Sequence, residues 1–159
     1  MRKTTKLEAI LWSIALPGFG QLLNGQLIKG FTFIFLEFLI NTKSSFNHAI
    51  LYSFLGQINK AFEVVNYQWL MFYPCVYMFA MYDAYKSSTP NPPYLSFLPF
   101  ASSAYTVTVG LMYSSKLHVG GVLLGPIWLP IIFLVPGLIL GFLVRHLLMK
   151  YIKRPEECS

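Results

Sequence analysis

Residues 121–144 read GVLLGPIWLPIIFLVPGLILGFLV, and this stretch carries no charged side chain. It is longer than the roughly 20 mainly apolar residues that a helix needs to cross the hydrocarbon core of a bilayer. Outward from it, other stretches also lack Asp, Glu, Lys and Arg, namely residues 9–28, 64–82 and 87–115. A soluble core also contains single stretches of this kind, but a chain of 159 residues built largely from them predicts an all-α, polytopic membrane protein.

The composition supports the same class of protein. Hydrophobic residues make up 55% of the chain and charged residues 11%, whereas ordinary soluble domains carry roughly a quarter charged residues. The net charge is +6, but basic residues gather beside apolar segments at the two ends, where they determine membrane topology. We therefore expect the lipid bilayer as a partner and no nucleic acid. The terminal basic residues are Arg2, Lys3, Lys6, Arg145, Lys150, Lys153 and Arg154.

The apolar pattern predicts four to six membrane segments. The clear ones are residues 7–23, 28–42, 67–86, 94–115 and 122–149. Residues 46–65 differ, because apolar side chains recur there at helical spacing while polar ones fall on another face, which predicts an amphipathic helix. This helix either lies flat on the membrane surface, which its polar content favours, or lines a polar interior as a poor span.

The most distinctive motif is PGFGQLLNGQLIKG at residues 17–30. Proline removes a backbone hydrogen bond and glycine permits unusual backbone angles, so a broken helix is expected, with the break near Leu16. The glycine spacing fits neither a dinucleotide fingerprint nor a P-loop, since Gln26 stands where the P-loop lysine is required. The motif is interpreted as a structural turn; the alternative is a solute or ion site on unwound backbone. The candidate polar site comprises Pro17, Gly18, Gly20, Gln21, Asn24, Gly25, Lys29, Gly30, Glu37 and Asp83.

Apart from Glu8 at the start of the first segment, Glu37 and Asp83 are the acids inside or bordering the clear membrane segments. A carboxylate in lipid is costly, so each is a functional hypothesis by default. Asp83 can pair with Lys86, three residues on, as an interfacial ion pair. Glu37 lies deeper, and it either pairs with a lysine through a tertiary contact or takes part in a proton or cation relay.

The motif at 17–30 also resembles the TM-two domain family of small membrane proteins, through its Gly-x-Gly step, a glycine five residues on and the basic-Gly step that follows. The family's second segment typically ends in an Asp with aromatic neighbours, and Trp69…Tyr82-Asp83-Ala84-Tyr85 is similar. The likeness is closer to bacterial relatives with Pro-Gly-x-Gly-Gln, and it covers about residues 7–86. It departs at 21–24, where the family has His-Arg-Phe-Tyr, and in the extra chain at 43–66 and after 87. The resemblance implies location and turn geometry, and no chemistry.

The Pro-rich loop 87–93 is the expected boundary between two membrane halves. The first half is residues 1–86, with an amphipathic insertion at 43–66. The second is residues 94–159, with two helices and a basic tail. Two small-xxx-small motifs in the second half predict close helix packing, inside the monomer or between copies; they are Gly121 with Gly125 and Gly137 with Gly141.

No residue pattern indicates catalysis or a cofactor. The two cysteines form no CxxC pair, and the three histidines are scattered without paired ligand spacing. No serine sits in a nucleophile elbow. We therefore expect no enzyme activity, no metal site and no cofactor.

The sequence favours a structural or accessory protein of the bacterial inner membrane, acting through helix contacts with itself as a homo-oligomer or with a membrane-protein partner. The alternative is a small transporter or channel component that uses the broken turn at 17–30 with Glu37. The basic ends predict that both termini are cytoplasmic, which requires an even number of crossings. We expect residues 7–42 to cross once in net, as a broken or re-entrant unit, because the second piece is short and carries Glu37. The alternative is that 46–65 crosses as a sixth segment.

Overall fold

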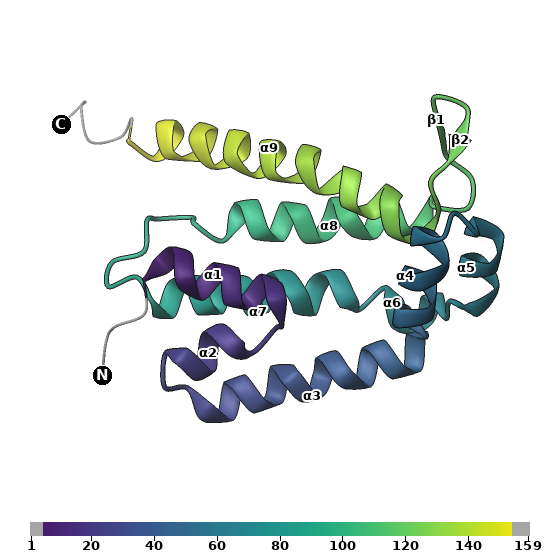
Figure 1. Cartoon of the computed structure of the whole chain (residues 1–159). Helices are drawn as coiled ribbons and strands as arrows, with labels where there is room; N and C mark the ends of the chain where they lie inside the picture. The colour runs from purple at the N-terminus through teal and green to yellow at the C-terminus, as the bar shows by residue number, and fades with distance from the viewer. Residues whose placement is uncertain (1–4, 154–159) are drawn as a thin grey trace.

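The computed structural model describes residues 5–153, so the basic residues Arg2, Lys3 and Arg154 lie outside the described residues (Figure 1). The fold is all-α, as predicted, with one small β-hairpin. Its elements are α1 (Lys6–Ala15), α2 (Phe19–Leu23), α3 (Leu27–Ser44), α4 (Phe46–Phe54), α5 (Ile58–Val64), α6 (Tyr67–Leu70), α7 (Tyr73–Ser87), α8 (Leu98–Met112), β1 (His118–Val119), β2 (Val122–Leu123) and α9 (Gly125–Lys153).

Four helices give the molecule its long axis. α3, α7, α8 and α9 run side by side and alternate in direction between the two ends of the molecule (Figure 1). α1 and α2 enter from one end and return to it, and they pack against α3 and α7. α4, α5, α6 and the hairpin gather at the opposite end (Figure 1). The start of α1 and the end of α9 therefore lie at the same end.

The predicted helix break near Leu16 is confirmed. α1 starts with a capping box, in which Thr5 and Glu8 bond each other's backbone amides, and its last residue is Ala15. Leu16 is extended at φ −155°, and Gly18 has a φ of +107°, a left-handed value that favours glycine. The chain therefore reverses between α1 and α2 instead of continuing as one helix.

Residues 46–65 do not form the one amphipathic helix that the sequence predicts. They form α4 and α5, which pack against each other. Gly56 separates them with a φ of +72°, so no continuous helix passes through it. In the same way residues 67–86 divide into α6 and α7, and α7 begins with Pro74 in its first turn, where proline is accepted.

A β-hairpin, residues 118–123, connects α8 to α9. Val119 pairs with Val122, and the two residues between them, Gly120 and Gly121, have φ values of +59° and +82°. Two left-handed residues in succession are the requirement of a tight type I′ hairpin. The Gly121–Gly125 pair is therefore no helix-packing motif: Gly121 lies in this turn, and Gly125, at φ +80°, is the residue that opens α9 beside Ile58.

Among the described helices, one is long and apolar enough to cross a membrane by length and composition, and it is α9 over Gly125–Ile152. α8 is apolar but shorter. α3 has 18 residues, but Lys29, Glu37 and Lys43 interrupt its apolar character.

Large apolar side chains point outward over much of the surface, while small residues fill much of the interior. On α3 the exposed fraction reaches 86% at Ile28 and 71% at Phe38. α9 exposes many more, including Ile139, Phe142 and Leu147. Fully buried positions are often alanine or serine: Ala9, Ala49, Ala61, Ala80, Ala84, Ser13, Ser44, Ser103 and Ser114. An apolar surface of this extent is typical of a protein that lies in lipid or against another protein.

Candidate functional site

One face of α7 collects the polar contacts of the N-terminal helices. Its residues are Tyr73, Tyr77, Ala80, Asp83, Ala84 and Ser87, and we call this face the α7 seam. They recur at intervals of three or four positions, so they form a single stripe along the helix. α1, α2 and α3 all reach this stripe with side chains or backbone.

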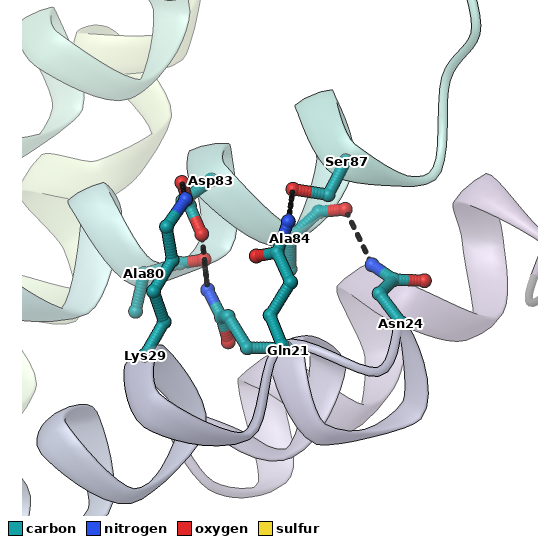
Figure 2. Close-up of polar contacts among 8 residues, drawn as sticks. Gln21, Asn24, Lys29, Ala80, Asp83, Ala84 and Ser87 are labelled. Carbon is teal, nitrogen blue, oxygen red and sulfur yellow. Dashed lines mark hydrogen bonds and ion pairs between the residues drawn. The ribbon is translucent and has the colours of Figure 1, made fainter.

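Gln21 lies at the centre of the contact between α2 and the α7 seam (Figure 2). Its side chain is fully buried, and its Nε2 donates to the backbone oxygen of Ala80 at 2.7 Å and to Oδ2 of Asp83 at 3.2 Å. The other amide atom, Oε1, has no hydrogen-bond partner among the described residues. A buried amide held in this way fixes the rotation of α2 against α7.

Three further side chains of the turn bond the end of α7. Asn24 Nδ2 donates to the backbone oxygen of Ala84 at 3.2 Å, and Gln26 Nε2 donates to Ser87 Oγ at 3.0 Å. Lys29 Nζ donates to Asp83 Oδ1 at 2.8 Å (Figure 2). The partner of Asp83 is therefore Lys29, which is 54 positions away, and not Lys86, as the sequence suggested.

Glycines allow the helices of this unit to approach closely. A Cβ built on Gly20 would lie 2.7 Å from both the Cβ of Ala84 and the backbone oxygen of Ala9, so α1, α2 and α7 meet at this point. A Cβ on Gly30 would lie 3.0 Å from the backbone oxygen of Gly18 and closer still to the side chain of Leu22. Gly25, in contrast, has free space around it, and its φ of +77° is what the turn before α3 requires.

The structure brings most of the candidate polar residues together but places Glu37 elsewhere. Glu37 Oε1 accepts a hydrogen bond from the hydroxyl of Tyr73 at 2.9 Å. Tyr73 precedes Asp83 by ten positions on α7, which is about 15 Å along a helix at 1.5 Å per residue. Glu37 and the turn at 17–30 are therefore two separate places along the same seam.

Tyr73 and Tyr77 were not among the residues predicted for the site, although both belong to the seam. Their rings stack with centroids 5.4 Å apart. The hydroxyl of Tyr77 donates to the backbone oxygen of Ile14, in the last turn of α1, where the helix break leaves carbonyls without helical partners. Two hydroxyl groups four positions apart in an apolar helix are the signal that could have identified them.

α8 and α9 form a second close contact, through the other glycine pair. A Cβ on Gly137 would lie 2.8 Å from the Cα of Ser103, and one on Gly141 would lie 2.8 Å from the backbone oxygen of Leu98. Ser102 Oγ donates to the backbone oxygen of Gly137 at 2.7 Å. Gly137 and Gly141 therefore pack inside the monomer against α8.

Between these two tight contacts the molecule is less densely packed. A cavity of about 300 Å³ lies between α4, α7, α8 and α9, and a second one of about 430 Å³ lies between α7 and α8. The first is lined almost entirely by apolar side chains, among them Phe46, Leu70, Met78, Leu111, Ile127 and Leu134. Neither lining contains a charged residue.

The described residues contain no group of three or more His, Cys, Asp or Glu side chains that could hold a metal ion. What the α7 seam and its contacts can do chemically is limited to hydrogen bonding, to the ion pair of Asp83 with Lys29, and to the carboxylate of Glu37 on α3. No described basic side chain lies within salt-bridge distance of Glu37. In comparisons with known proteins, no family model, no curated protein and no solved structure matches this chain.

Proposed function

We propose that this chain is a multi-pass integral membrane protein of a structural or accessory kind, which acts through helix contacts with itself or with a partner. The observation that carries the proposal is that polar and large apolar side chains lie in different parts of the molecule. The polar side chains of the turn at 17–30 are used in internal contacts with the α7 seam, while large apolar side chains point outward. Such a surface suits lipid and neighbouring helices.

The location that we propose is a bacterial inner membrane, crossed by α9, the one described helix long and apolar enough by itself, and by the shorter helices α3, α7 and α8 of the same bundle. In this proposal α1 and α2 form a re-entrant unit, so residues 7–42 cross once in net. The alternating directions of the long helices support the proposal, since they put the start of α1 and the end of α9 at one end (Figure 1). Lys29 supports it too, because its pairing with Asp83 places it at this same end, which we infer to be cytoplasmic.

The resemblance of residues 7–86 to the TM-two domain family gains support from the same contacts. The motif at 17–30 and the aromatic segment that ends in Asp83 are the two parts that carry the resemblance. They meet through Gln21 and Lys29. We propose that these two contacts with Asp83 are the structural reason why the two sequence motifs occur together.

A small transporter or channel component is the second candidate, and Glu37 is the observation that favours it. A carboxylate in the middle of a membrane helix is a common part of an ion pathway. The contacts of the turn at 17–30 argue against a solute site there, because its side-chain donors are occupied by α7. Gly18, Gly20 and Gly30 are also covered by neighbouring segments.

Extraction of membranes with alkaline carbonate and with high salt tests the location. We expect the protein to remain in the membrane pellet and to need detergent for release, because its outer surface is apolar. Release by carbonate or salt alone would contradict an integral membrane protein.

Photo-cross-linking tests the proposed contacts. A photoreactive amino acid is placed at Phe35, which is 63% exposed on α3, and in a control at Phe33, which is 8% exposed on the same helix. We expect discrete protein adducts in intact membranes from Phe35 or from its exposed neighbours Ile28, Phe31 and Phe38, and none to another chain from Phe33. Adducts to lipid alone from all exposed faces, together with solute flux in proteoliposomes, would favour the transporter instead.

A further inference from the structure

Glu37 lies on α3 and contacts the α7 seam through Tyr73. It differs from the other polar residues of this contact because one of its carboxylate oxygens has no partner among the described residues. It is half-buried on α3, and its Oε1 accepts the hydroxyl hydrogen of Tyr73 at 2.9 Å. Its Oε2 accepts no hydrogen bond from a described residue, and it is not among the buried polar atoms. The described part of the chain contains one ion pair, between Lys29 and Asp83, so no described basic side chain lies within salt-bridge distance of Glu37.

The approach to this carboxylate is left open by the short first helix. α1 ends at Ala15, and the hydroxyl of Tyr77 reaches its last turn at the backbone oxygen of Ile14. Tyr73, which holds Glu37, is four positions before Tyr77, or about 6 Å further along α7. α1 therefore ends about one helical turn before the level of Glu37.

Aromatic rings lie beside the bonded side of this carboxylate, because Tyr73, which donates to Glu37, packs on two other rings. Tyr73 and Tyr77 stack with centroids 5.4 Å apart, and Phe46 packs on Tyr73 at 4.6 Å. A carboxylate without a basic partner in this apolar setting favours a cation, because opposite charges attract more strongly where the dielectric constant is low. A neutral donor would gain a hydrogen bond but no charge pairing, and an anionic group would be repelled.

We propose that Glu37 receives the ammonium group of a lysine on a membrane helix of a partner protein; this assignment rests on the proposed function and names the chemistry of its contact. Lysine fits better than arginine. Arginine pairs best with both oxygens of a carboxylate, and here one oxygen is already bonded by Tyr73. A lysine also has a long, flexible stem that can reach a half-buried acid from the surface of its own helix.

The test uses the full chain in lipid nanodiscs and synthetic membrane helices of polyleucine with one central residue, which is lysine, glutamine or leucine. Binding is measured by fluorescence energy transfer between labelled peptide and protein. We expect the lysine peptide to bind at least about tenfold more tightly than the other two, the size expected of a charge-assisted bond in a site of low dielectric. Equal affinities for the three peptides would overturn the proposal with the unaltered protein alone.

Two variants locate the effect. Glu37→Gln should bind the lysine peptide no more tightly than the glutamine peptide, whereas Glu63→Gln, which removes an exposed acid on α5, should keep the preference. A preference that survives in Glu37→Gln, or butylammonium that binds as tightly as the lysine peptide, would each exclude a partner lysine at Glu37. Carbonate extraction and cross-linking of the same proteins report separately on the proposed function, so each can fail without the other.

Discussion

At the scale of single residues, Gln21 has more influence on the structure than its place in a turn suggests. It is fully buried and bonds the α7 seam through one nitrogen, at Ala80 and Asp83. Gln26, five positions later, makes one exposed bond to Ser87. The two glutamines therefore provide a matched pair, in which the same side chain is lost from a fully buried or from a partly buried position.

We expect Gln21→Ala to lower the free energy of unfolding by about 2 to 3 kcal/mol, because it removes buried hydrogen bonds and leaves a cavity. Gln26→Ala should lower it by less, within about 1 kcal/mol, because it removes one exposed hydrogen bond from a partly buried side chain. Thermal unfolding in detergent measures both. Equal losses in the two variants would mean that Gln21 is not a centre of the contact between α2 and α7.

Local residues explain what the sequence predicted well and what it missed. Pro17 and Gly18 act on their own backbone, so the break after Ala15 could be predicted from them alone. The partner of Lys29 could not be predicted, because Asp83 is 54 positions away and a nearer lysine, Lys86, was available. A contact of this kind depends on how α3 and α7 pack, which spacing along the chain does not contain.

At the scale of elements, the apolar periodicity did not reveal the break between α4 and α5. The apolar spacing of residues 46–65 continues across Gly56, so the pattern alone joined α4 and α5 into one helix. The hairpin had a readable signal, since Gly120-Gly121 stands between two valines. The candidate site was predicted in part. The turn residues and Asp83 were found, but the other residues of the α7 seam were not, because the contact joins segments far apart in the sequence.

The turn at Gly56 leads to a prediction with a matched control. Gly56→Ala should lower the free energy of unfolding by about 1 to 2 kcal/mol, because alanine is strained at a positive φ although free space surrounds the residue. Gly56→Asn should be tolerated better, since asparagine visits the left-handed region more readily. Thermal unfolding in detergent compares them, and a loss as large in Gly56→Asn would point to a steric cause instead.

The contact between α8 and α9 leads to a further prediction. Gly137→Leu should destabilise the protein by about 1 to 3 kcal/mol, because its Cβ has no room beside Ser103 and the helices must separate. Leu138→Ala, at a neighbouring position that is 37% exposed, should cost less. Unfolding temperatures in detergent provide the measurement, and equal tolerance of both changes would contradict the close approach of the two helices.

At the scale of the whole molecule, the two ends of the helix bundle differ in charge. Described basic residues cluster at the end where α1 starts and α9 finishes, and they are Lys6, Lys29, Lys86, Arg145, Lys150 and Lys153 (Figure 1). The opposite end carries Lys43, Lys60 and Lys116. This asymmetry favours a cytoplasmic position for the first end.

Cysteine labelling in intact spheroplasts tests that orientation, in a background with Cys75→Ser and Cys158→Ser. His118→Cys, in the exposed hairpin, should react with a maleimide that cannot cross the membrane. Asn91→Cys, in the loop between α7 and α8, should react only after the cells are permeabilised. Labelling of position 91 from outside, or protection of position 118, would reverse or refute the proposed topology.

The Tyr77 bond to the last turn of α1 has a consequence for biosynthesis. The donor lies 63 residues after its acceptor, and the Gln21 bond to Ala80 spans 59 residues. A ribosome that adds about 5 to 20 residues per second needs roughly 3 to 13 s to produce that interval. In the proposed topology, the polar groups of α1 and α2 lack their partners in α7 during this time, and lipid offers no substitutes. We therefore expect α1 and α2 to remain at the membrane surface and to insert into the membrane only after α7 has been made.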